Sequence, residues 1–168
     1  MIAIPHIVIG AAIGAKTHNL GLIIIFSLLG HWIMDRIPHW DYASLKNIVD
    51  FQQTKKIKYL LIFLRKLSVD ILVGLLIVLG IIISKKNFDL NSLIFIVIGI
   101  FFSILPDIVL FIITLFVDSE KNKFVKGYLD FHKKFLHFKH KEKEGQITFL
   151  GLLTQIIVII CALIGFFV

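Results

Sequence analysis

The sequence predicts an all-α membrane protein, a polytopic bundle of about five apolar helices with one amphipathic helix on the cytoplasmic side. Composition is the first observation: 58% of the 168 residues are hydrophobic and only 17% are charged, and the mean hydropathy is +0.93. An ordinary soluble domain is roughly 45–50% apolar and about 25% charged. The second observation is that the apolar residues gather in long segments. The length suits a single membrane domain covering residues 1–168.

Five apolar segments are expected to form the bundle. In chain order they cover about residues 2–15, 20–37, 67–84, 91–117 and 146–168. The first has 14 residues. As a helix it would be ~21 Å long, which is short for a full crossing. Pro5 suits its first turn, where an amide has no partner within the helix. In the fourth segment, Pro106 predicts a kink or a break.

A further segment, about residues 121–140, is expected to be an amphipathic helix. Its aromatic residues recur at spacings of four and three, with lysines between them: Phe124, Tyr128, Phe131, Phe135 and Phe138. Such a helix lies on a leaflet or packs on the bundle without touching lipid, and the pattern leaves both open. In either case its lysines favour anionic headgroups.

The basic residues predict the orientation. Of the 18 lysines and arginines, seven lie in residues 36–66, eight in 118–145 and three elsewhere. The positive-inside rule makes both basic regions cytoplasmic, so anionic lipid headgroups on that side are the expected partners. The net charge of +7 comes with no nucleic-acid recognition motif, and we expect no nucleic-acid partner. Cys161 is the single cysteine, which excludes an internal disulfide and a cysteine zinc cluster.

Each of the first four apolar segments carries a stripe of small or polar residues spaced four apart, and therefore on one helix face. The stripes are His6, Gly10 and Gly14; Ser27, His31 and Asp35; Asp70 and Gly74; and Gly99, Ser103 and Asp107. Small residues let helices approach closely, and ionisable side chains inside a span are costly and usually functional. In the expected topology the histidines and aspartates of all four stripes lie on the cytoplasmic side. Packing of the stripes would bring them together.

This set of side chains predicts a divalent metal site. Carboxylates left unpaired in a low-dielectric region would be driven to protonate, whereas a cation keeps them ionised. Mixed imidazole and carboxylate ligands suit Zn²⁺, with Mn²⁺ and Fe²⁺ as alternatives. The predicted ligands are His6, His31, Asp35 and Asp107, and the additional candidates are His39, Asp41, His132 and His137. A cation there would make a bound water nucleophilic near neutral pH, which is hydrolase chemistry.

Other polar residues complete this hypothesis. Asp70 is the candidate general base or a further ligand, and Arg36, Arg65 and Lys66 could neutralise a substrate phosphate. The sequence leaves structural alternatives open for them. Asp70 could instead form an ion pair with Arg65 or Lys66, and the basic side chains could simply extend to the headgroups.

Three motifs resemble the YdjM-like family of bacterial membrane-bound metal-dependent hydrolases: PHIVIGAAIG at residues 5–14, GHWIMDRIPHWD at 30–41 and ILPDIVL at 104–110. The resemblance implies a small helical membrane protein in which His6, His31, Asp35 and Asp107 bind metal. The chain departs from the family pattern because its LPD-type motif comes late and carries Val109 where the family has a second acid. The family's paired histidines are replaced at best by FHKKFLH at residues 131–137.

Together these inferences predict an integral protein of a bacterial or archaeal cytoplasmic membrane. Its expected function is metal-dependent hydrolysis, at the cytoplasmic interface, of a phosphate ester in a lipid or lipid-linked substrate. The alternative is a non-catalytic membrane protein with a structural His/Asp cluster and a basic helix that binds a partner or lipid. A small transporter is less favoured, because the polar groups gather at one membrane face and not at the midplane.

Overall fold

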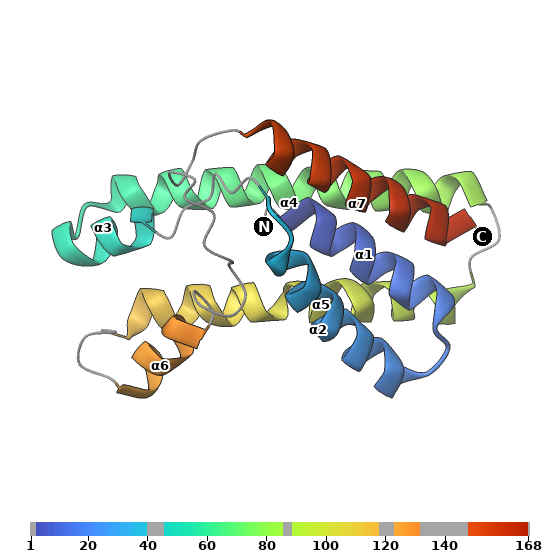
Figure 1. The fold of residues 1–168 in the computed structure, drawn as a ribbon, viewed down its shortest axis with the longest axis horizontal. Helices are drawn as coiled ribbons and strands as arrows, with labels where there is room; N and C mark the ends of the chain where they lie inside the picture. Colours follow the sequence, from blue (N-terminus) through green and yellow to red (C-terminus); the bar gives the residue numbers. More distant parts are fainter. Residues whose placement is uncertain (1–2, 40–45, 86–88, 118–122, 132–147, 168) are drawn as a thin grey trace.

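The computed structural model describes residues 3–39, 46–85, 89–117, 123–131 and 148–167. These residues form helices and no strand, which confirms the all-α class. The helices are α1 (Ala3–Lys16), α2 (Leu20–Arg36), α3 (Lys46–Thr54), α4 (Ile57–Lys85), α5 (Leu90–Phe116), α6 (Lys123–Phe131) and α7 (Phe149–Phe167) (Figure 1).

Helix α1 is the centre of the bundle. It packs against α2, α4, α5 and α7, which surround it (Figure 1). Its apolar residues Ile7, Val8 and Ala11 are therefore fully buried, together with Phe166 at the end of α7. A helix enclosed in this way needs apolar residues on almost every face, which explains why α1 has the composition of a span although it has only 14 residues.

Three of the described helices, α4, α5 and α7, are long and apolar enough to span a membrane, so the predicted count of five spans is not confirmed. Many of their leucines and isoleucines face outward; Leu72 is 57% exposed and Leu76 56% exposed. Soluble monomers rarely expose contiguous apolar surface on this scale. The outward faces are consistent with a membrane protein.

Several boundaries differ from those predicted. Helix α4 begins ten residues before residue 67, because Arg65 and Lys66 end the apolar run but are good helix formers. Helix α5 continues through Pro106, so the predicted break is absent there. Helix α3 was not predicted, and it packs on α4 with Ile48 buried. Of the amphipathic segment, residues 123–131 form α6, whereas residues 132–140 lie outside the described ranges.

The backbones of α1 and α5 are in direct contact along the small-residue stripes. A Cβ added to Gly10 would collide with the carbonyl of Gly99, one on Gly99 would collide with the carbonyl of Gly10, and one on Gly14 would collide with the carbonyl of Phe95. Only glycine permits this approach. The contact sets the relative depth of the two helices, and with it the positions of their polar residues.

Helix N-caps stabilise the end of the bundle at which the short connection between α1 and α2 lies. The Asn19 and Asp89 side chains accept hydrogen bonds from first-turn amides of α2 and α5. Ser92 makes side-chain and backbone hydrogen bonds to Asp89, which lower the pKa of that carboxyl. Lys85 donates to the carbonyl of Phe166 and so ties α4 to the end of α7. The histidines and aspartates of the stripes lie toward the opposite end.

Candidate metal centre

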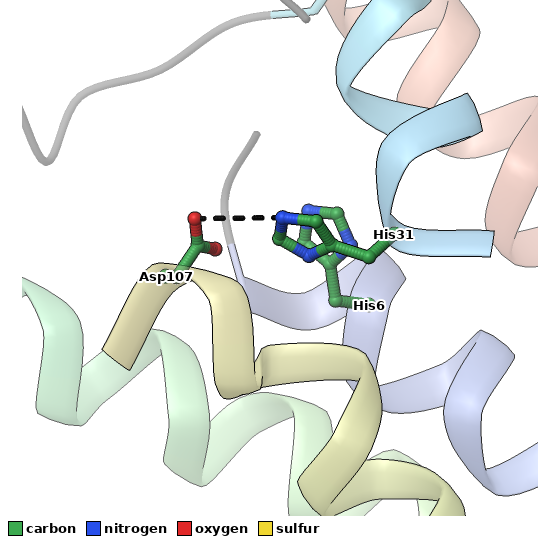
Figure 2. Close-up of side chains that lie close together, drawn as sticks. All are labelled: His6, His31 and Asp107. Carbon is green, nitrogen blue, oxygen red and sulfur yellow. Dashed lines mark ion pairs between the residues drawn. The ribbon is translucent and has the colours of Figure 1, made fainter. Parts of the chain in front are cut away.

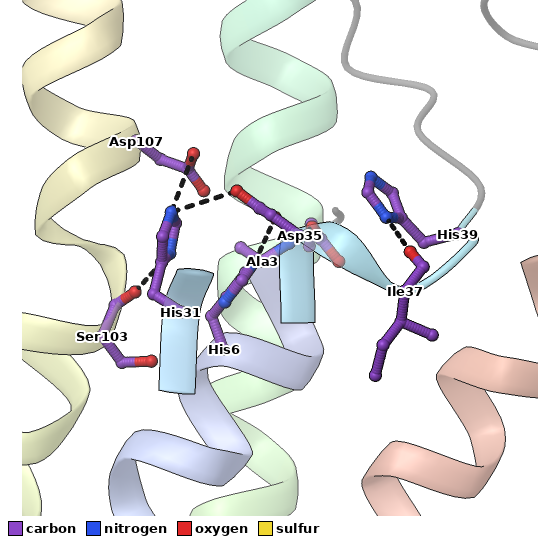
Figure 3. Close-up of polar contacts among 9 residues, drawn as sticks. Ala3, His6, His31, Asp35, Ile37, His39, Ser103 and Asp107 are labelled. Carbon is purple, nitrogen blue, oxygen red and sulfur yellow. Dashed lines mark hydrogen bonds and ion pairs between the residues drawn. The ribbon is translucent and has the colours of Figure 1, made fainter. Parts of the chain in front are cut away.

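Side chains from three helices meet where α1, α2 and α5 pack together. The Asp35 carboxylate faces the Nε2 edges of both imidazoles, with Oδ1 3.3 Å from His6 Nε2 and Oδ2 3.2 Å from His31 Nε2. Asp107 of α5 also approaches the imidazole of His31, with its Oδ1 3.8 Å from His31 Nε2 (Figure 3). The structure therefore brings together the four residues that the sequence predicted as metal ligands.

The four side chains of the cluster differ in their exposure to solvent. The two imidazole rings are stacked, with centroids 4.3 Å apart (Figure 2). The side chains of His6, His31 and Asp35 are completely buried, whereas that of Asp107 is 37% exposed. Of the four side chains, Asp107 is therefore the one that solvent reaches.

The tautomer of His31 is determined by the backbone of α5. His31 Nδ1 lies 2.8 Å from the carbonyl oxygen of Ser103. A carbonyl only accepts, so Nδ1 must carry the proton, and a neutral ring then has its lone pair on Nε2. This lone pair points toward the carboxylates of Asp35 and Asp107, where only a cation or a proton makes the contact favourable. A histidine that donates one ring nitrogen to a carbonyl and presents the other is arranged as metal-ligating histidines are.

The cluster fits a divalent cation by donor type, spacing and burial. Bonds of ~2.0–2.2 Å to nitrogen and oxygen in a tetrahedral site place neighbouring ligand atoms about 3.3–3.6 Å apart. The His31–Asp107 separation is 3.8 Å, and the two imidazoles lie 3.3 and 3.2 Å from different oxygens of the Asp35 carboxylate. One ligand atom from each of His6, His31 and Asp107 lies within 4.8 Å of the others. Among the described residues, the buried Nε2 atoms of His6 and His31 face only these carboxylates, and the buried Nδ1 of His6 makes no hydrogen bond.

Asp70 of α4, the predicted general base, contacts the first turn of α1. Its buried carboxylate accepts a hydrogen bond from the backbone amide of Ala3, in the first turn of that helix. First-turn amides have no partner within the helix, and a carboxylate there is further stabilised by the helix dipole. Asp70 thus anchors the helix that carries His6, and a catalytic role for Asp70 stays a prediction.

Replacement of Asp70 tests the anchoring role. Asp70→Ala leaves the Ala3 amide buried without its acceptor, which should destabilise the protein by about 1–3 kcal/mol. Asp70→Asn keeps an acceptor oxygen in place and should recover most of that stability. Thermal unfolding in detergent measures both, and equal losses for Asn and Ala would contradict the anchoring role.

The structure describes the surroundings of the other predicted site residues in less detail. His39 Nδ1 donates to the carbonyl of Ile37, 2.7 Å away, and no described contact joins it to the four ligands. Arg36 and Arg65 are exposed and Lys66 is half-buried. The additional ligand candidates Asp41, His132 and His137 lie outside the described residues.

Three neighbours of the cluster were not predicted from the sequence. The carbonyl of Ser103 holds His31, and Thr154 of α7 donates to the carbonyl of Pro38, just beyond α2. Tyr128 of α6 lies within electrostatic range of Asp107. Burial, and secondly the Asp107 carboxylate, raise the pKa of the Tyr128 phenol. A polar residue in an apolar span, such as Thr154, could have been noticed. A backbone carbonyl leaves no signal in the residue type.

No protein-family model, curated protein or solved structure matches this chain. The functional interpretation therefore rests on the geometry of the chain's own residues.

Proposed function

We propose that this protein is a divalent-metal-dependent hydrolase of the cytoplasmic membrane, acting on a phosphate ester of a lipid or lipid-linked substrate. The observation that carries the proposal is the convergence of two imidazoles and two carboxylates in a buried cluster with one exposed edge. His6, His31, Asp35 and Asp107 would hold the metal.

Charge balance favours a divalent cation. The buried carboxylate of Asp35 needs a positive charge beside it, and the partly exposed carboxylate of Asp107 adds a second negative charge. One divalent ion bound with two neutral imidazoles gives a site of zero net charge. Zn²⁺ suits this donor set first, and Mn²⁺ or Fe²⁺ second. When bound, such an ion supplies Lewis-acid polarisation and lowers the pKa of a bound water toward 7.

The chain's own residues support an approach of substrate from one side. Asp107 is the ligand with an exposed edge, so a phosphate group would enter there. Arg36, next to Asp35, and Arg65, five residues before Asp70, are exposed and cationic. Cationic side chains at this end of the bundle would attract an anionic headgroup and offset charge that develops during phosphoryl transfer.

Helix α7 supports a location close to one membrane surface. Its 19 residues correspond to about 28 Å, close to the thickness of the hydrocarbon core. Thr154 near its start bonds to Pro38, three residues after Asp35, and Phe166 near its end bonds to Lys85. The cluster is thus level with the beginning of α7, and the positive-inside rule makes this the cytoplasmic side.

The direct test is metal-dependent release of phosphate by the detergent-purified protein. We expect hydrolysis of phosphatidic acid micelles or p-nitrophenyl phosphate that a chelator abolishes and Zn²⁺ or Mn²⁺ restores. Asp107→Ala should lower the rate by at least about 100-fold, while Lys16→Ala, at the opposite end of α1, should not. Wild-type protein that binds metal but hydrolyses neither compound would favour the non-catalytic alternative.

A further inference from the structure

The start of α4 extends beyond the level at which α7 begins. Lys85 at the end of α4 donates to the carbonyl of Phe166, near the end of α7, so the two helices end at the same level. Helix α7 has 19 residues, and 19 residues of α4 counted back from Lys85 reach residue 67. The earlier part of α4, residues 57–66, continues for about 15 Å further. Figure 1 shows this part of α4 beside α3, beyond the start of α7.

Helix α3 packs on this extension, and the two form one unit, the basic arm, which covers residues 46–66. Phe63 of the arm is buried and stacks on Phe111 of α5, with ring centroids 5.3 Å apart. Gln52 donates to the carbonyl of Leu115, 3.3 Å away. The arm is therefore packed against the last turns of α5.

An apolar stripe follows the outward face of α4 from the arm into the span. Leu61, Leu72 and Ile83 are each eleven residues apart, which is three helical turns, so they lie on one line along the helix. Their exposed fractions are 57%, 57% and 66%. Within the arm, Ile57 and Leu64 lie on the same face as Leu61 and are also exposed. The arm thus presents to its surroundings the apolar face that the span would present to lipid.

Cationic side chains border this stripe. Lys58 and Arg65 are both exposed, and each is next in sequence to a residue of the stripe. Residues 46–66 hold six lysines and arginines and one acidic residue, which is a net charge of +5. Long cationic side chains beside exposed apolar residues are typical of helices at the headgroup level, where the stem lies along lipid and the charge reaches the phosphates.

The charge of the arm also decides between possible partners. A contiguous apolar surface is unfavourable in water, so the stripe requires a cover. A second copy of the chain would bring a net charge of +5 against the same charge, which opposes association through this face. Anionic phospholipid supplies an apolar cover and the opposite charge together.

We propose that the basic arm lies in the headgroup layer of the membrane, with its apolar stripe against lipid and with Lys58 and Arg65 bound to the phosphates of anionic phospholipids. The 29 residues of α4 are about 43 Å long. A tilt of about 30° fits this length into the hydrocarbon core and one headgroup layer, roughly 37 Å in all. This lipid contact requires neither metal nor hydrolysis, so it stands or falls separately from the proposed function.

The first test measures the surroundings of Leu61 in vesicles of phosphatidylcholine and phosphatidylglycerol. Leu61→Cys, in a chain whose single native cysteine is removed by Cys161→Ala, carries a fluorescent label. We expect phospholipids with a nitroxide near the headgroup to quench this label more strongly than acrylamide in the water does. Leu72→Cys is the matched control on the same face, and nitroxides deep in the acyl chains should quench it best.

Two results of this test would overturn the proposal. A label at Leu61 that acrylamide quenches more strongly than lipid nitroxide lies in water. A label that neither quencher reaches is covered by protein, either a second copy or another chain. The control label at Leu72 shows in both cases that the protein is embedded in the vesicle.

The second test asks whether the arm selects anionic lipid. With the nitroxide on the headgroup, phosphatidylglycerol should quench the label at Leu61 about fivefold better than phosphatidylcholine at equal content. Replacing both cations, Lys58→Gln with Arg65→Gln, should remove most of this preference. Lys16→Gln, at the opposite end of the bundle, should leave it unchanged. Equal quenching by the two lipids in the chain that keeps both cations would reject the phosphate contacts, whatever the protein does with metal.

Discussion

His31→Ala should abolish stoichiometric binding of divalent metal by the purified protein. His31 Nε2 lies within 3.8 Å of both carboxylates, and its orientation is held by the carbonyl of Ser103. Structural zinc sites bind with about 10–16 kcal/mol, so one ligand of four accounts for roughly 2.5–4 kcal/mol. Its loss should weaken affinity roughly 10²- to 10³-fold. Metal content after dialysis, measured by elemental mass spectrometry, gives the result.

His18→Ala is the control for this experiment. His18 lies between α1 and α2 at the opposite end of the bundle, beside the ring of Phe95. Its replacement should leave about one metal ion per chain. Equal loss of metal from the His18 and His31 variants would mean that the ions bind non-specifically, and a metal-free wild type would reject the metal centre altogether.

The four candidate ligands could be predicted because helix geometry carries most of the information. The spacing of four residues places Ser27, His31 and Asp35 on one face of α2, and the distance from the helix end determines their depth. The same reasoning applies to His6 and Asp107. Once the small-residue faces pack together, face and depth determine which side chains meet.

Contacts that depend on backbone atoms could not be predicted in this way. The partner of His31 Nδ1 is the carbonyl of Ser103, and the partner of Asp70 is the amide of Ala3. Almost every residue type presents the same backbone carbonyl and amide, so these hydrogen bonds cannot be predicted from residue identity. The sequence predicts Asp70 on the third apolar segment, but its contact with the first turn of α1 depends on the tertiary structure.

The extent of the helices was predicted less well than their faces. Hydropathy marks where a helix leaves an apolar environment, not where its backbone hydrogen bonds end. Helix α4 therefore begins at Ile57, ten residues before the expected start of the apolar segment at residue 67. The same physical distinction explains α1, which has the composition of a span because neighbouring helices bury it and not because of its length.

Gly99→Ala should strongly destabilise the protein and also weaken metal binding. A Cβ at this position would collide with the backbone carbonyl of Gly10, which has no rotamer through which to yield, so α1 and α5 must move apart. Overpacking typically costs about 1–3 kcal/mol, and a collision with backbone belongs at the upper end of that range. Because α1 carries His6 and α5 carries Asp107, their separation also spreads the ligand atoms.

Gly80→Ala is the matched control, since a Cβ on Gly80 meets no atom within 4 Å. Alanine favours a helix over glycine by about 1 kcal/mol, so this variant should unfold at the same temperature as wild type or slightly higher. Thermal unfolding and metal affinity are measured on both variants. If Gly99→Ala behaves like Gly80→Ala in both, the two backbones are not in contact, and the depth at which His6 meets Asp107 must have another cause. If stability falls while affinity stays unchanged, the ligands are held together by the cluster itself and not by the packing of α1 on α5.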